Sequence, residues 1–302
     1  MPRPARVDTP PVPAPEADDP PPQDAWPVGL ATLRGELDRI DDQLHALLMR
    51  RALVVEQVAR AGKRAAFRPG REASIIRRLL RRHGGRLPAQ AVVRIWRELL
   101  AGTTAMQGPF TVAVCESDSD AGFTQAAREH FGALTPLHVH RSPAQAMAEV
   151  IGGSASVGVL PYPSEAGTPR DTWWTALLQE DQPRLHVVAR LPFWMRRAEG
   201  APTVQSLVIA AIAPDASEHD RSLLGFQLDP DMNRARLTQA LIAVGLAPAA
   251  MILRRDRGLA HALVEVDGYV TDVDPRLAGI GSAFHPPVVL GAYAIPEDGG
   301  AP

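Results

Sequence analysis

The segment 30–107 concentrates side chains that bind anions. It holds 16 Lys or Arg residues against 7 Asp or Glu residues, whereas the whole chain has a formal net charge of −2. All of these cations are arginines except Lys63, the single lysine of the chain. A guanidinium group pairs with carboxylate or phosphate through two hydrogen bonds, so a small anionic molecule or a nucleic acid would suit this segment. A solvated helix face is the third interpretation.

The spacing of the arginines limits which of them can share a ligand. Arg34 and Arg51 are 17 residues apart, which is about 25 Å along a helix axis. Two arginines at that distance cannot hold one small molecule, so they serve different sites or Arg34 reaches the site of a partner subunit. Arg71 and Glu72 open a second predicted helix, where unpaired backbone N–H groups favour an anion.

Three helices must position these side chains. Apolar residues recur at three- and four-residue steps and predict one long helix over 30–61. A shorter helix is expected over 71–83, and a third begins at "LPAQAV". Thr103 and Gln107 lie four residues apart and so share a face of that third helix. Because the long helix outruns the other two, we expect a dimer in which the long helices pack across each other.

After Gly108 the sequence pattern changes. Short apolar strands such as "FTVAV", "LHVH" and "ASVGVLP" alternate with helices, which predicts an α/β layer. The last part has the order βαββαβ of the ferredoxin-like split motif. The predicted fold class is therefore multi-domain, α plus α/β. The expected parts are a disordered Pro-rich tail over 1–29, a helical domain over 30–107, an α/β region over 108–218 and a ferredoxin-like unit over 219–297.

Composition points to the cytoplasm. No apolar run approaches the ~18 residues of a membrane span, and the N-terminus shows no charged-then-apolar signal pattern. Cys115 is the single cysteine and cannot form an internal disulfide. We therefore expect a cytoplasmic protein without a membrane partner.

The helical segment resembles a known enzyme family. The stretch "LATLRGELDRIDDQLHALLMRR" is followed by a lysine, by "RE" at the start of a second helix and by "T...Q" at the end of a third. This pattern resembles the all-helical chorismate mutases, in particular the mutase domain that often precedes prephenate dehydratase. The resemblance implies an intertwined dimer of three-helix domains that rearranges chorismate to prephenate in aromatic amino-acid biosynthesis. It implies neither a metal nor a cofactor.

The resemblance also implies which residues bind the substrate. Arg51 and Arg71 would grip its carboxylates, and the neighbouring subunit would lend Arg34. Glu72 would accept the hydrogen bond of the ring hydroxyl, and Thr103 would line the pocket.

The implied catalytic residues are Lys63 and Gln107, whose N–H groups would meet the negative charge that grows on the breaking ether oxygen. One such donor contributes about 3–4 kcal/mol. Aligned without gaps, the family's lysine falls on Gly62, and one residue is a rotation of about 100° in a helix. The freedom of Gly62 would let Lys63 turn into the site. A second departure is Arg68, where the family often has an aspartate.

The stretch 108–297 resembles a reduced prephenate dehydratase followed by an ACT-like unit. The part before the ACT-like unit is too short for a two-lobed dehydratase, and "TVQSLVIAAIA" lacks the Thr-Arg-Phe motif that carries dehydration. "PDMNRARLTQAL" and "ILRRDRG" stand where the phenylalanine-binding signatures would be. We therefore predict that dehydratase activity is lost and that the ACT-like unit is a scaffold or senses another small molecule.

Two alternatives stay open. One is a bifunctional chorismate mutase/prephenate dehydratase, and the other is a basic helical regulator that binds nucleic acid and carries an ACT-like sensor. Against the regulator, Phe67 and Trp96 are the only aromatic residues of the basic segment, which leaves too few rings for stacking on bases. No nucleic-acid partner is therefore expected. The remaining arginines of the second helix are expected on a solvated face: Arg77, Arg78, Arg81 and Arg82.

Overall fold

The computed structural model describes most of the chain as two units. The described residues are 29–61, 67–116, 122–165, 168, 171–179, 182–197, 199–256, 259–281 and 284–298. Unit 1 comprises residues 1–53 and unit 2 comprises residues 54–302. The predicted tail lies outside the described residues except for Gly29, and so does Lys63.

The predicted long helix is confirmed as α1, Leu30–Arg60, with 31 residues. None of its residues is buried. Its apolar side chains recur at helical spacing, and those of Leu37, Leu47 and Leu53 are each 60% exposed. An apolar stripe on a helix is stable when another surface covers it. Within the described helices, none is both long and apolar enough to cross a membrane.

Helices α2, Pro69–Arg82, and α3, Ala89–Ala105, confirm the two shorter predicted helices. Pro69 occupies the first turn of α2, where its missing N–H costs no helical hydrogen bond. The two helices bury Ile76 and Leu100 in one apolar cluster. Phe193 and Ala294, far away in the sequence, complete that cluster. Within unit 2 these helices therefore pack on the same body as the sheet.

One nine-stranded sheet runs through unit 2 in the order β2-β1-β3-β5-β4-β9-β6-β8-β7. The first half of the sheet contains β1 (Val112–Cys115), β2 (Leu137–His140), β3 (Val157–Pro161), β4 (His186–Leu191) and β5 (Ser206–Ala210). Strand β1 pairs in parallel with β2 and β3, while β5 pairs antiparallel with β3 and β4.

Two helices cover opposite faces of this half. Helix α4, Phe123–Phe131, joins the cluster that contains Val112 and Val114. Helix α5, Pro143–Ile151, joins the cluster of Ala113 and Cys115, together with the short 3₁₀ helix η1, Trp173–Leu178. Successive residues of a strand point to opposite faces, so α4 and α5 cover the two faces of β1. The predicted α/β layer is therefore confirmed.

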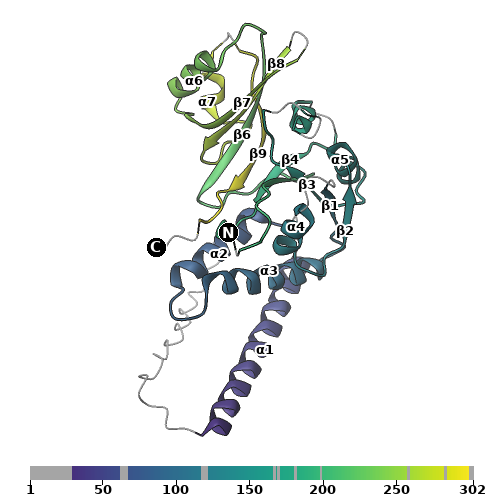
Figure 1. Ribbon diagram of the computed structural model, residues 1–302, viewed down its shortest axis with the longest axis vertical. Coiled ribbons are helices and arrows are strands. Elements are labelled where there is room, and N and C mark those ends of the chain that lie inside the picture. The colour runs from purple at the N-terminus through teal and green to yellow at the C-terminus, as the bar shows by residue number, and fades with distance from the viewer. Residues whose placement is uncertain are drawn as a thin grey trace, which may run out of the picture. The chain divides into compact units, whose positions relative to one another are not determined.

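The second half is a ferredoxin-like unit, as predicted. Its elements are β6 (Asp220–Leu228), α6 (Arg234–Ala243), β7 (Pro248–Asp256), β8 (Leu259–Asp267), α7 (Pro275–Ala278) and β9 (Val288–Ala294). Their chain order is βαββαβ, and the sheet order β9-β6-β8-β7 is fully antiparallel. Figure 1 shows α6 and α7 together on one face of these strands.

The two halves of the sheet meet where β4 pairs in parallel with β9, at Val187 and Gly291. Gly291 has φ +139°, and a Cβ atom there would lie 2.1 Å from the Val187 carbonyl oxygen. Only glycine fits such a close approach between two backbones. The α/β region and the ferredoxin-like unit therefore share one sheet.

Candidate functional site

The N-terminus of α2, where an anion is predicted, already has one from within the chain. The Asp215 carboxylate accepts hydrogen bonds from the backbone N–H groups of Gly70, at 3.0 Å, and Arg71, at 3.2 Å. It also pairs with Arg68 at 3.2 Å. A Cβ atom on Gly70 would lie 2.1 Å from the Asp215 backbone oxygen, so glycine is required for this contact. The side chain of Arg71 is exposed beside this cap.

Glu72 faces a buried arginine. Its Oε2 atom accepts a hydrogen bond from Arg97 Nη1 at 3.1 Å. The same Nη1 atom lies 3.4 Å from His130 Nε2, and the guanidinium of Arg97 lies 5.0 Å from the centroid of the Phe193 ring. Burial lowers the pKa of Arg97 to about 10, although Glu72 opposes that shift. Arg97 therefore stays charged at neutral pH and fixes one oxygen of Glu72.

His130 is neutral in this arrangement. It is buried, and burial followed by the charge of Arg97 lowers its pKa well below 6.5. A neutral ring has one nitrogen that accepts, which suits the contact of Nε2 with the Arg97 donor.

Thr103 and Gln107 lie together at the end of α3. The Thr103 hydroxyl donates to the backbone oxygens of Leu99 and Leu100 at 2.9 and 3.0 Å. The Gln107 side-chain amide donates to the Thr103 carbonyl oxygen at 2.9 Å. The i, i+4 neighbourhood expected of these two residues is present.

The remaining predicted site residues lie elsewhere. Arg34 is exposed and Arg51 is half-buried on the part of α1 that belongs to unit 1. Lys63 lies outside the described residues. Unit 2 thus presents Arg71 with Glu72 on α2, and Thr103 with Gln107 at the end of α3, and the catalytic roles of all seven residues remain predictions.

Arg77 corrects the expectation of a solvated face. It is buried and donates to Ser217 O at 3.1 Å, to Ser217 Oγ at 2.9 Å and to Glu297 Oε1 at 2.5 Å. Further bonds reach the carbonyl oxygens of His219 and Ile295. The other three arginines of that set, Arg78, Arg81 and Arg82, are exposed.

A buried polar cluster crosses the sheet, and sequence reasoning missed it. Glu265 of β8 accepts hydrogen bonds from the hydroxyl groups of Tyr162 and Tyr293, the latter at 2.7 Å. Arg190 of β4 lies 4.6 Å from the centroid of the Tyr162 ring. Burial raises the pKa of both tyrosines, so their hydroxyl groups remain donors. The available signal was a charged residue inside the apolar strand "HALVEV".

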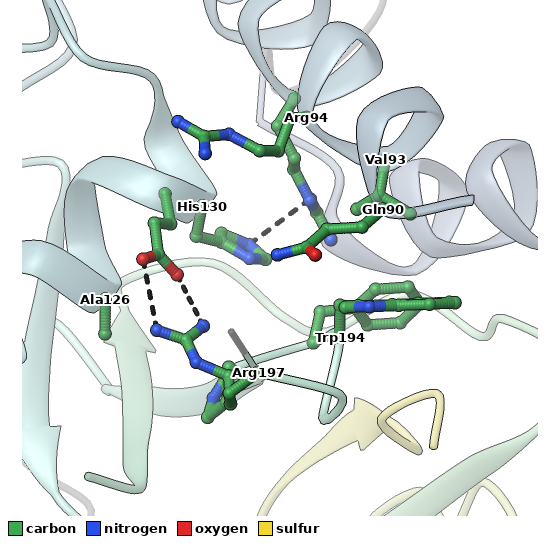
Figure 2. Close-up of a pocket in the computed structure, with 11 residues that line it drawn as sticks. Gln90, Val93, Arg94, Ala126, His130, Trp194 and Arg197 are labelled. Carbon is green, nitrogen blue, oxygen red and sulfur yellow. Dashed lines mark hydrogen bonds and ion pairs between the residues drawn. The ribbon is translucent and has the colours of Figure 1, made fainter. Parts of the chain in front are cut away.

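A cavity of about 60 Å³ lies between α3, α4 and the segment that follows β4. Figure 2 shows Gln90, Arg94 and His130 projecting from the helices, with Trp194 and Arg197 opposite them. The sequence gives no signal for Trp194 and Arg197, because nothing in "LPFWMRR" indicates which helix this segment contacts.

Comparisons with known proteins agree with the sequence resemblance. Residues 33–108 match the chorismate mutase type II family. The bifunctional chorismate mutase/prephenate dehydratase of Pseudomonas aeruginosa is 30% identical over 141 residues, which cover 44% of this chain and 38% of that protein. The enzyme of the same name from Neisseria gonorrhoeae is 35% identical over 101 residues, or 33% of this chain and 27% of that protein.

Two solved structures align with TM-scores below 0.5. The quorum-quenching acylase GqqA has a TM-score of 0.47 at 15% identity and covers 62% of this chain and 96% of its own. The prephenate dehydratase of Streptococcus mutans has a TM-score of 0.45 at 13% identity, covering 62% and 98%. The chain spans less than two fifths of the length of the two curated relatives named above. Its N-terminal part carries a chorismate mutase type II domain, over residues 33–108.

Proposed function

We propose that the protein is a chorismate mutase that rearranges chorismate to prephenate. The observation that carries the proposal is the family match over residues 33–108, which includes every predicted site residue. The reaction is unimolecular, so the site must hold a folded dianion and meet charge on the ether oxygen. A segment rich in arginine, with one lysine, supplies both kinds of group.

Three residues of one chain bind the substrate's polar groups in this proposal. Arg51 and Arg71 hold the carboxylates through charge-assisted hydrogen bonds. Glu72 accepts the ring hydroxyl: the contact with Arg97 occupies one side of its Oε2 atom, and a carboxylate has about four acceptor positions. Thr103 lines the pocket beside them.

Lys63 and Gln107 are the proposed catalytic residues, with N–H groups directed at the ether oxygen. The Gln107 amide donates to the Thr103 carbonyl oxygen of α3, and it has a second N–H for the substrate. Lys63 supplies a compact positive charge, for which the surrounding arginines are poor substitutes.

We also propose that the enzyme is a homodimer in the cytoplasm. The apolar stripe of α1 is uncovered in a single chain, and the matching stripe of a second copy would cover it. Arg34 then belongs to the neighbour's active site. The single cysteine is consistent with a reducing compartment.

The α/β region is proposed to have lost dehydratase activity, and the ferredoxin-like unit to act as a scaffold. The missing Thr-Arg-Phe motif supports the first statement. The continuous sheet supports the second, because the ferredoxin-like unit completes the structure that carries β4 and β5. A bifunctional enzyme remains the second candidate, since the curated relatives bear that name.

The deciding experiment follows the loss of chorismate absorbance with wild-type protein, Lys63→Ala, Gln107→Ala and the exposed control Arg78→Ala. Removal of one donor to the developing charge should lower kcat by about 100- to 1000-fold, while the control should match the wild type. Prephenate without phenylpyruvate is the expected product, and phenylpyruvate would establish the bifunctional enzyme. Full activity in Lys63→Ala would overturn its assignment. Salt-sensitive retention on DNA without turnover would favour the regulator instead.

A further inference from the structure

The cavity between α3 and α4 is positively charged. Three arginines line it: Arg94, Arg97 and Arg197. Arg197 pairs with Glu129, which also lines the cavity, with one contact at 3.1 Å. Arg97 pairs with Glu72 at 3.1 Å. Across the described residues no ion pair or hydrogen bond involves Arg94. Among the three arginines and the two carboxylates that pair with them, Glu129 and Glu72, the positive charges therefore exceed the negative charges by one. 

Two donors of the residues that line the cavity have no acceptor. Trp194 Nε1 and Arg197 Nε are buried, and neither has a partner in the part of the chain that the structure describes. A buried donor without an acceptor costs about 1–3 kcal/mol. The His130 ring does not add a positive charge, because burial lowers its pKa well below 6.5. The described residues therefore supply no acceptor for these two donors, and a negatively charged one would suit the surrounding arginines.

The size of the cavity limits that acceptor. A space of about 60 Å³ exceeds the roughly 10–15 Å³ that one water molecule needs. It is far too small for a nucleotide or an aromatic ring system, so only a headgroup of a few atoms can enter.

We propose that this cavity binds a small oxyanion, either inorganic phosphate or the carboxylate group of a small metabolite. Arg94, which is exposed, supplies a charge that no ion pair holds among the described residues, and Trp194 and Arg197 supply donors without a partner. This site is distinct from the predicted mutase pocket: Arg94 and Arg97 line it from α3, whereas Thr103 and Gln107 lie at the end of that helix.

The same arginine connects the cavity to the mutase residues. Arg97 contributes to the cavity lining and holds Glu72, so an anion in the cavity would compete with Glu72 for its hydrogen bonds. This consequence rests on the proposed mutase activity, but binding itself does not. A filled cavity would then raise the KM for chorismate more than it lowers kcat.

Binding is tested on the full chain by calorimetry and thermal unfolding, with phosphate and malonate as probes and sodium chloride keeping the ionic strength constant. Saturable binding of either probe is expected, and the probe that binds identifies the source of the oxyanion. Arg94→Gln and Trp194→Phe should each weaken binding about tenfold, which corresponds to about 1.4 kcal/mol. Arg78→Gln, on the exposed face of α2, should bind as the wild type does.

Two results would overturn the proposal: neither probe binds more than chloride does, or both cavity variants bind with unchanged affinity. The two variants keep the test informative if one of them folds poorly, because Arg94 is exposed and pairs with nothing that the structure describes. A mutase assay with and without the bound probe is separate. Binding without any change in KM would remove only the connection through Arg97, and absence of turnover would count against the proposed function and leave the binding result intact.

Discussion

At the scale of single residues, two neighbouring residues of the same type can differ in burial. Arg77 and Arg78 read alike in "IIRRLLRR", yet one is buried and the other is exposed. One step along a helix rotates a side chain by about 100°. The partners of Arg77 are residues 217, 219, 295 and 297, and helix periodicity contains no information on segments so distant.

This pair gives a matched test of buried charge. Arg77→Ala removes a buried guanidinium and leaves the carbonyl oxygens of Ser217 and Ile295 without their donor, so the free energy of unfolding should fall by about 3–5 kcal/mol. Arg78→Ala changes an exposed side chain and should stay within about 0.5 kcal/mol. Denaturant unfolding measures both. Equal losses for the two variants would contradict the burial of Arg77.

His130 gives a prediction on pH. Its folded-state pKa is lowered well below 6.5 by burial and by Arg97. Above pH 6.5 the ring is neutral in both states, and as the pH falls further the unfolded chain binds a proton that the folded chain does not. Stability is therefore lost on acidification, by up to about 1.4 kcal/mol per pH unit from this group. The loss ends at the folded-state pKa.

The measurement compares unfolding free energies of the wild type and His130→Gln between pH 7 and pH 5. The variant should lose less stability than the wild type over this range, because Gln does not titrate. Parallel curves for the two proteins would show that His130 is not held neutral by the fold.

At the scale of elements, the sequence predicts type and order well. Each helix expected over 30–61, 71–83 and from "LPAQAV" is present, because their apolar residues repeat with a helical period. The 3₁₀ helix η1 was not predicted. Its six residues, "WWTALL", are too few for a period, and four of them are buried.

The apolar stripe of α1 predicts self-association. Replacing Leu44 and Leu47 by Glu puts two charges on that stripe, which should shift the protein from dimer to monomer because a buried unpaired charge is costly. Sedimentation or light scattering gives the mass. Arg39→Gln, on an exposed charged side chain of the same helix, should remain a dimer. A monomeric wild-type protein would refute the dimer directly.

At the scale of the whole molecule, the packing between distant segments was beyond sequence reasoning. The order βαββαβ predicts the ferredoxin-like unit, because that motif has one established topology. Nothing in it shows that β9 also pairs with β4, or that α2 packs near both strands. The candidate site could likewise be predicted only in part. Helical spacing relates Thr103 to Gln107. The contacts of Glu72 with Arg97 and of the Arg71 backbone with Asp215 depend on the tertiary fold, which helical spacing does not predict.

Gly291 provides the test of the sheet's continuity. Gly291→Ala places a methyl group 2.1 Å from the Val187 oxygen, so β4 and β9 must separate and stability should fall by more than about 3 kcal/mol. Gly268→Ala is the control. It also has a positive φ, of +95°, but nothing lies within 4 Å of its Cβ position, so only the backbone strain of about 1–2 kcal/mol applies. Similar losses in both variants would argue against the close contact.

The contacts of Arg77 set an order of events during synthesis. Helix α2 is synthesised well before its partner, because its buried Arg77 pairs with Glu297, which is 220 residues further along the chain. At about 5–20 residues per second, Glu297 follows Arg77 by roughly 10–45 seconds. Until then the side chain of Arg77 remains in water, and the apolar cluster that includes Ile76 of α2 lacks Ala294. Helix α2 can therefore reach its final packing only after residue 297 has been synthesised.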